Sequence, residues 1–407
     1  METHTAEWLS LLARWVHIIA AIMWIGNSML YNWMDRNLRP GKDHNETKFG
    51  ELWMLHGGGF YRLEKFRAQS STLPPLLYWF KWQSYTTWIS GFALLILVYF
   101  QSRGAFLLNP ANDLSYGEGV ATALAFLATG WLVYDILWRI PSKGSGIKIV
   151  LSLLLLVFAV KFATDTFSGR GAYLMVGAML ATLMSGNVFF HIMVSQRKMM
   201  ADIESGQDQD MALYTRAKTR SIHNNYITFP VIFTMMSNHF ANLYGHPLNW
   251  AILLILMCMS ALIRHFMNIR FTWKPWFAAC VATFIISGLL LFLVFRFGAK
   301  PAHASSAAAS ATDGPAVTFD EARPIIQNRC LPCHSETPST DNPMYAALAT
   351  TTGGVHFDTP EQIKAYAERI KIRAIDQDTM PLGNMTGMTT EERTTLARWL
   401  AAGASIN

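Results

Sequence analysis

Long apolar runs separated by short polar connections recur through the first 298 residues of the chain. Each run approaches the length that a helix needs to cross the roughly 30 Å hydrocarbon core of a bilayer. The pattern predicts an all-α, polytopic bundle of about eight transmembrane helices, of which the fourth is the shortest. The predicted spans are residues 8–31, 85–100, 119–138, 149–163, 172–194, 222–244, 248–266 and 275–297.

Composition and charge support a membrane protein. The 407-residue chain is 52% hydrophobic and only 15% charged, which is too apolar for a soluble core. Lys and Arg collect in alternate connections, and the others hold only Arg103, Lys161 and Arg170. Because basic residues favour the cytoplasmic side, we expect both termini at the periplasmic face of a bacterial inner membrane. The net charge of +6 then reflects topology and indicates no nucleic-acid partner.

A second region follows an Ala/Ser-rich stretch. Residues 299–316 have the composition of a flexible linker and divide a membrane domain, residues 1–298, from a C-terminal domain, residues 317–407. That domain contains Cys330-Leu331-Pro332-Cys333-His334, the pattern that attaches one haem c covalently through two cysteines and places the histidine on the iron. No second cysteine pair is present to complete a zinc site. The pattern indicates electron transfer.

The second axial ligand of this haem is expected shortly before the last helix. Met380 is the preferred candidate, and Met385 and Met388 are the alternatives. Residues 389–392 then read as a capping box that opens an amphipathic helix. This order predicts a class I-like cytochrome c domain, and a thioether opposite a histidine raises the haem potential.

Histidines inside the predicted spans are candidates for b-type haem ligands, because a buried ionisable group in a membrane is usually functional. Helical rise places His17 and His239 near the outer side and His191 and His265 near the inner side. These pairs could hold one or two haems b. The alternative is that the imidazoles only form hydrogen bonds within the bundle.

Other polar residues gather at the inner depth. Asn187 and His191 are four residues apart, as are Arg264 and Asn268, so each pair shares a helical face. His223-Asn224-Asn225 opens the sixth predicted span, and His56-Gly57-Gly58-Gly59 lies in an inner connection. Together they predict a cytoplasm-facing pocket for a planar, anionic molecule, with the glycines allowing close approach. The alternative for the glycines is a flexible turn.

Several of these motifs resemble one family. They are His56-Gly57-Gly58-Gly59-Phe60-Tyr61, the run from Leu73 to Tyr85, Asn187-Val188-Phe189-Phe190-His191, and His223-Asn224-Asn225-Tyr226 through Ser237-Asn238-His239. Over essentially its whole length the chain is similar to membrane-bound, cytochrome c-fused urate oxidases. The resemblance implies oxidation of urate to 5-hydroxyisourate, with electrons passing through haem to a soluble cytochrome c or a terminal oxidase. The base that takes the proton is then His56, His223 or Glu64.

Two other functions are compatible with the motifs. A quinol:cytochrome c oxidoreductase would use the same histidines for haem, but its pocket would open sideways into the lipid. A non-catalytic subunit for haem tethering or metal transport would leave the inner polar residues without a role. The glycines and cations at the inner depth favour urate over both.

Overall fold

The computed structural model describes residues 3–40, 48–66, 77–101, 106–109, 112, 114–141, 144–298, 317–337, 345, 348–349, 352, 354–377 and 379–406. The predicted linker, residues 299–316, lies outside the described residues. So do residues 73–76 of the second resemblance motif.

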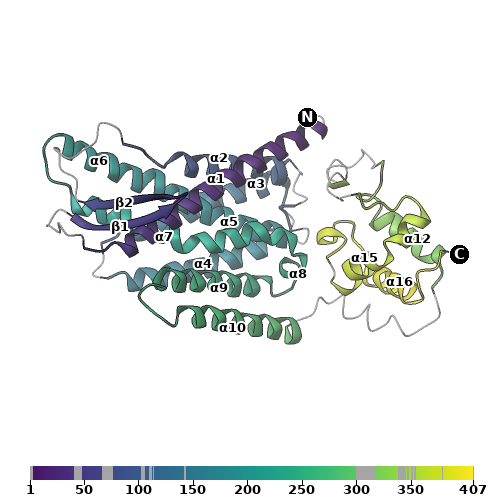
Figure 1. Cartoon of the computed structure of the whole chain (residues 1–407). Helices are drawn as coiled ribbons and strands as arrows, with labels where there is room; N and C mark the ends of the chain where they lie inside the picture. The colour runs from purple at the N-terminus through teal and green to yellow at the C-terminus, as the bar shows by residue number, and fades with distance from the viewer. Residues whose placement is uncertain are drawn as a thin grey trace.

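The membrane part is a bundle of long helices (Figure 1). Seven are long and apolar enough to cross a membrane, which indicates a multi-pass membrane protein. The long helices are α1 (Thr3–Asn37), α2 (Trp82–Leu94) continued by the π-helix η2 (Leu95–Phe100), α3 (Tyr116–Arg139), α4 (Gly146–Thr166), α5 (Gly169–Gly186) continued by the π-helix η3 (Asn187–Ile192) and α6 (Met193–Glu204), α7 (Met211–Met236), α9 (Asn249–Ile269) and α10 (Trp276–Phe297).

Helix α7 is long, but its sequence is too polar for it to be counted with these seven helices. The prediction of eight apolar spans is therefore correct for seven. Helix α7 packs against α5, η3, α6 and α9, and its polar residues Arg220, Asn224 and Asn225 are buried. A helix covered by protein need not be apolar, because its polar groups find partners on neighbouring helices. By contrast, α4 and α10 expose many large apolar side chains, as helices that face lipid do.

The sixth predicted span ends earlier than expected. Helix α7 stops at Met236, and the 3₁₀ turn η4 (Ser237–His239) and the short helix α8 (Ala241–Tyr244) follow. His239 therefore lies in an exposed turn beyond the helix, not within a span. The N-terminus, α8 and the C-terminal helices lie at one end of the bundle, and α6 lies at the other (Figure 1).

A β-hairpin corrects the all-α prediction. Strands β1 (Lys48–His56) and β2 (Gly59–Phe66) pair antiparallel. Gly57 and Gly58 have φ of +59° and +81°, the left-handed values that a two-residue hairpin turn with the right twist requires. The hairpin packs on the ends of two helices, where Phe49 stacks on Tyr214 of α7 and Lys65 pairs with Asp35 of α1 at 2.6 Å.

The C-terminal helices have their own hydrophobic core. They are α12 (Phe319–Arg329), α14 (Pro360–Ala365), α15 (Ala367–Ile370), the π-helix η5 (Lys371–Asp376), the 3₁₀ turn η6 (Leu382–Asn384) and α16 (Thr390–Ala401). Helices α12 and α16 pack together, with Phe319 and Trp399 5.8 Å apart between ring centroids. The predicted capping box is confirmed: Thr389 caps α16 and accepts from the backbone of Glu392. We call residues 317–406 the C-terminal unit.

Candidate functional site

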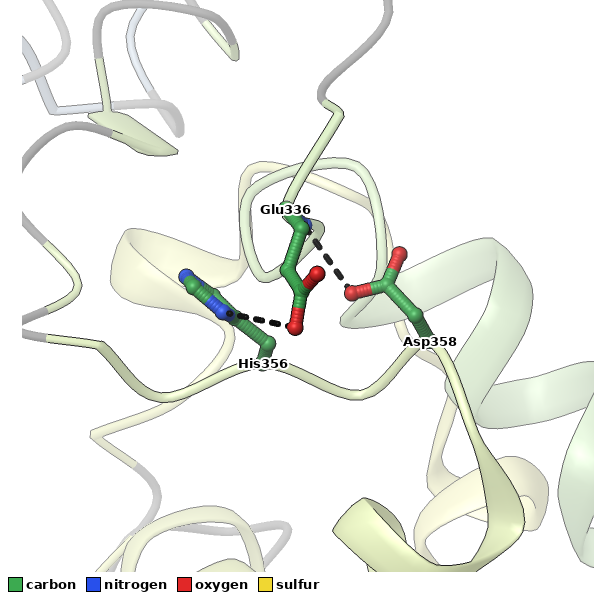
Figure 2. A group of neighbouring side chains, drawn as sticks. All are labelled: Glu336, His356 and Asp358. Carbon is green, nitrogen blue, oxygen red and sulfur yellow. Dashed lines mark hydrogen bonds and ion pairs between the residues drawn. The ribbon is translucent and has the colours of Figure 1, made fainter.

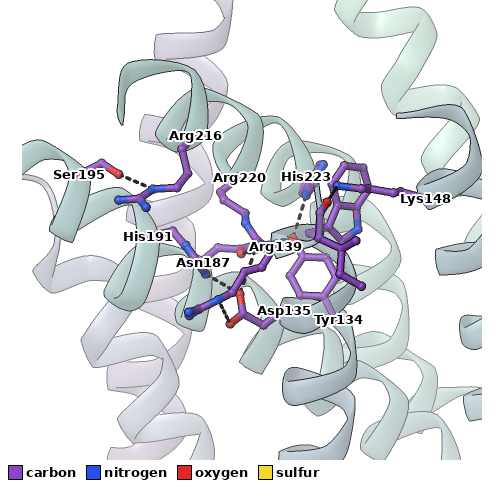
Figure 3. Close-up of polar contacts among 12 residues, drawn as sticks. Tyr134, Asp135, Arg139, Lys148, Asn187, His191, Ser195, Arg216, Arg220 and His223 are labelled. Atoms are coloured by element: carbon purple, nitrogen blue, oxygen red, sulfur yellow. Dashed lines mark hydrogen bonds and ion pairs between the residues drawn. The ribbon is translucent and has the colours of Figure 1, made fainter. Parts of the chain in front are cut away.

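A buried network surrounds Asp135 of α3. Its carboxylate is 2.5 Å from Nε2 of His191 in η3, 2.9 Å from a guanidinium nitrogen of Arg220 in α7, and 2.7 Å from Nε of Arg139 (Figure 3). Asp135, His191 and Arg220 are each less than 8% exposed. A buried carboxylate needs such partners to offset its desolvation. Here Asp135 compensates the charge of Arg220.

Tyr134, the neighbour of Asp135, organises a second group of contacts. Its hydroxyl lies 2.7 Å from Nδ1 of His223 and accepts from Nδ2 of Asn187 at 2.9 Å (Figure 3). Asn187 also donates to Asn224 at 2.9 Å. Asn187 and His191 both lie on the π-helical segment η3, a local widening that is frequent at functional sites. The predicted association of Asn187, His191, His223 and Asn224 is therefore seen.

The opposite side of α7 carries a different cluster. Asn225 accepts from Nε of Arg264 at 3.2 Å and from Nδ2 of Asn268 at 2.7 Å, both on α9. Arg264 is 3% exposed and lies over the ring of Phe229. Within the described part of the chain, no carboxylate pairs with it. A buried guanidinium with only amide and aromatic neighbours is costly, unless an anion binds there.

A cavity of about 120 Å³ adjoins this guanidinium. It lies between α1 and α9, and its polar lining is Asn32, Arg36, Arg264, Asn268 and Arg270. Trp33 offers an aromatic wall. Three arginines, two amides and an indole match the chemistry of a planar anion with hydrogen-bonding edges, since guanidinium groups bind carboxylate-like edges and stack on rings.

The predicted catalytic residues are not brought together. His56 is exposed at the hairpin tip, Gly57 and Gly58 form the turn, and Gly59 pairs with His56 as the first residue of β2. None of these glycines lines the cavity beside Arg264, and their role in substrate binding stays a prediction. Glu64, on the same hairpin, pairs with Lys48 at 3.1 Å and with Arg62 at 2.6 Å. Of the three predicted bases, only His223 lies among the buried polar residues of α7.

The predicted haem b histidines occupy separate surroundings. Nδ1 of His17 lies 2.9 Å from the carbonyl of Thr87 and 3.1 Å from Ser90 on α2, which leaves Nε2 as the atom that could reach an iron. His239 is in the exposed turn described above. His265 bonds through Nδ1 to Tyr226 at 2.8 Å, whereas Nε2 of His191 is held by Asp135. Neither predicted pair meets in one group of contacts, and haem b stays a prediction.

The Cys-x-x-Cys-His segment fits a covalently bound haem. Cys330 and Cys333 are free thiols, and burial raises the pKa of Cys330 to about 12 and that of Cys333 to about 11. Nδ1 of His334 lies 2.9 Å from the carbonyl of Val355, which fixes the ring and directs Nε2 away, as for metal-bound imidazoles. Met380 and Cys330 both pack against the hydrophobic core of the C-terminal unit, and Met388 is buried within that core.

Hydrogen bonds and one ion pair connect the residues after this segment to residues 356–358. Asp358 accepts from the backbone of Glu336 at 2.9 Å, and Glu336 lies 3.6 Å from Nδ1 of His356 (Figure 2). Asp358 also accepts from the hydroxyl of Ser335 at 2.6 Å. Phe357, which lies between His356 and Asp358 in the sequence, donates its backbone N–H to the carbonyl of His334 at 2.8 Å. These bonds hold residues 355–358 against His334.

Several residues of these clusters were not predicted from the sequence. Tyr134, Asp135, Arg220, Arg36 and Arg270 are not among the predicted site residues. Asp135 lies 56 positions from His191 and 85 from Arg220, and Arg36 lies more than 200 positions from Arg264, so local spacing does not bring these residues together. One available signal was the i, i+4 spacing of Asp135 and Arg139, which predicts a pair on one helical face.

Comparison with known proteins agrees with the resemblance for the membrane part. The family model described as Urate oxidase N-terminal matches residues 3–295. No curated protein and no solved structure matches the chain. The matched stretch contains α1 to α10, the hairpin and both buried arginine clusters. Since it covers more than half of the sequence, the chain belongs to the Urate oxidase N-terminal family, whose name implies an oxidoreductase that acts on urate.

Proposed function

We propose that the protein is a urate oxidase of the bacterial inner membrane that converts urate to 5-hydroxyisourate and passes the electrons to haem c in its C-terminal unit. The observation that carries this proposal is Arg264: a buried guanidinium without a carboxylate partner in the described structure, beside a cavity that Arg36 and Arg270 also line. Family membership supplies the substrate, and the cavity supplies the matching chemistry.

Urate fits this lining because it is planar, anionic near neutral pH, and bordered by hydrogen-bonding groups. Arg264 and Asn268, both held by Asn225, would bind one edge of the anion. Arg36 and Arg270 would compensate its charge, and Trp33 would cover a face of the ring. These side chains are fixed before substrate arrives, so little freedom is lost on binding.

The reaction balances with water as the oxygen donor. One urate and one water give one 5-hydroxyisourate, two protons and two electrons. A base must take a proton as the electrons leave. His223 contacts Tyr134 through Nδ1 and lies on the opposite side of α7 from the cavity, and none of the three predicted bases lines the cavity, so the proton is assigned to no one of them. Cys330, Cys333, His334 and Met380 would hold the haem, which would supply one-electron transfer to a soluble cytochrome c or a terminal oxidase.

One experiment separates this function from a quinol:cytochrome c oxidoreductase. Purified protein in detergent is mixed anaerobically with urate, and the absorption band of the c-type haem is followed. Urate alone should reduce the haem, and 5-hydroxyisourate should appear at one molecule per two electrons. A quinol should give little reduction in a parallel sample, because a neutral quinol does not compensate the three arginines that line the cavity beside Met29, Trp33, Met267 and Phe271. Reduction by quinol and not by urate would contradict the proposal.

A further inference from the structure

A second cavity lies at the opposite end of the bundle, where the C-terminal unit meets it. Its volume is about 220 Å³. The bundle contributes Arg170 at the start of α5 and Tyr244 and Gly245 at the end of α8. The C-terminal unit contributes Thr379, Leu382 and Met385, which lie on either side of the predicted haem ligand Met380 in the sequence. We call the contact around this cavity the junction.

The wall on the bundle side is preformed. A methyl group at Gly169 would lie 2.0 Å from the carbonyl oxygen of Tyr244, so α8 rests directly on the start of α5. The guanidinium of Arg170 stacks over Phe106 at 4.4 Å, and its Nε donates to Asn238 at 3.3 Å. These contacts hold Arg170 at the junction. Burial there raises the pKa of Tyr244, and the charges of Arg170 and of Arg373 from the C-terminal unit oppose this shift only in part.

The C-terminal unit presents its haem-binding side to this wall. Leu348 of the C-terminal unit is buried in one hydrophobic cluster with residues of the bundle helices, and Cys333, Leu382 and Met385 pack against this shared cluster. Cys330 packs instead against the core of the C-terminal unit. The Cys-x-x-Cys-His segment therefore lies at the boundary between the two. Thr379 is in contact as well, since a Cβ built on Gly245 would lie 3.2 Å from its methyl group.

We propose that the junction is the internal electron-transfer surface of the protein: the C-terminal unit docks there with its Cys333 and Met385 side on α5 and α8, and electrons leave the membrane part through this contact. The inference rests on the proposed function for its direction of electron flow. Each transfer would deliver one electron to the haem that Cys330, Cys333, His334 and Met380 would hold, so two transfers would complete one urate oxidation. Because the Arg264 cavity lies at the other end of the bundle, the haem b predicted in the bundle would carry the electrons to the junction. Small contacts are typical of electron-transfer partners, and a tether keeps the effective concentration of such a partner high.

The docking is tested by a disulfide that only the docked arrangement allows. In the variant Gly245→Cys, Thr379→Cys, the two Cβ atoms should come within the range that a disulfide needs. A protease site inserted into residues 299–316 lets the two parts be separated after oxidation. Under non-reducing conditions the fragments should stay joined. The control pair Gly117→Cys, Thr379→Cys has its first cysteine where no atom lies within 4 Å, and its fragments should separate.

The electron route is tested on the same cross-linked protein. Urate-driven reduction of the c-type haem, followed by stopped flow, should proceed within about twofold of the rate before cleavage and cross-linking. In Gly245→Trp, whose indole would displace Thr379, that rate should fall at least tenfold while dithionite reduces the haem as fast as before. Absence of the disulfide would overturn the docking. A cross-linked protein that dithionite reduces but urate does not would overturn the electron route.

These outcomes are distinct from failure of the proposed function. If urate is not the substrate, the unmodified protein will also show no reduction by urate, whereas the disulfide will still form. Single cysteine variants with an unchanged haem spectrum show that neither substitution disturbs the fold.

Discussion

Two arginines, one on α7 and one on α9, are equally buried but differ in whether a carboxylate compensates their charge. Arg220 and Arg264 are each 3% exposed. Arg220 is 2.9 Å from the carboxylate of Asp135, whereas Arg264 has Asn225 and Phe229 as neighbours and other arginines around its cavity. A buried charge that a partner in the fold compensates helps to stabilise the fold. A charge that is left uncompensated is available to a ligand, at a cost in stability.

Removal of Arg220 should give the largest loss of stability. Arg220→Gln leaves Asp135 buried with less compensation, and we expect the free energy of unfolding to fall by about 3 kcal/mol. Thermal unfolding in detergent measures the change. Arg139→Gln is the matched control, because Arg139 contacts the same carboxylate but is 62% exposed in its side chain, and it should change little. Equal losses of stability in the two variants would mean that the burial of Arg220 does not determine its contribution to the free energy of unfolding.

A double-mutant cycle isolates the pair itself. Asp135→Asn combined with Arg220→Gln should recover roughly 2 kcal/mol relative to the sum of the single changes, because neither charge is then left alone. The same thermal assay reads out the coupling. Additive effects would place the stabilising role of Arg220 elsewhere, for example in its contact with the ring of Tyr134.

Removal of Arg264 should have the opposite signature. Without a carboxylate partner among the described residues, Arg264→Gln removes a buried charge but keeps a group that can bond to Asn225. We expect stability without urate to stay within about 1 kcal/mol of the unmodified protein, or to rise. If the variant instead loses as much stability as Arg220→Gln, the two arginines do not differ as described.

The smallest effect should come from Asn268. Its side chain donates to Asn225 at 2.7 Å and lines the cavity, so Asn268→Ala removes one neutral hydrogen-bonding group near the anion. Urate affinity should fall by about fivefold, which corresponds to about 1 kcal/mol. Equilibrium dialysis with urate measures it, and Asn112→Ala, in an outer segment, serves as the control. An unchanged affinity would remove Asn268 from the site.

The sequence predicted the parts of the molecule that depend on local pattern. Apolar runs identify α1 to α5, α9 and α10, and a capping box places α16. Asn187 with His191 and Arg264 with Asn268 were found by helical spacing. The hairpin was missed although two short runs of apolar and aromatic residues flank Gly57-Gly58-Gly59, because runs this short do not distinguish a strand from a helix by periodicity.

What local pattern could not predict is the pairing between helices. Asp135 and Arg139 predict an exposed ion pair, and only the packing of α3, η3 and α7 brings His191 and Arg220 to the same carboxylate. Likewise, Arg36 lies at the end of α1 and meets Arg264 and Arg270 at one cavity only in the folded bundle. The functional contrast between the two arginines is therefore a tertiary property.

The most direct test of this contrast is a urate binding isotherm for Arg264→Gln beside Arg220→Gln and the unmodified protein, measured anaerobically with oxidised haem. Loss of a charged hydrogen bond to the anion should weaken urate binding to Arg264→Gln by roughly 30-fold, about 2 kcal/mol. Folded Arg220→Gln should bind urate within about threefold of the unmodified protein. Unchanged affinity in Arg264→Gln, with lost affinity in Arg220→Gln, would contradict the account and place the substrate on the other side of α7.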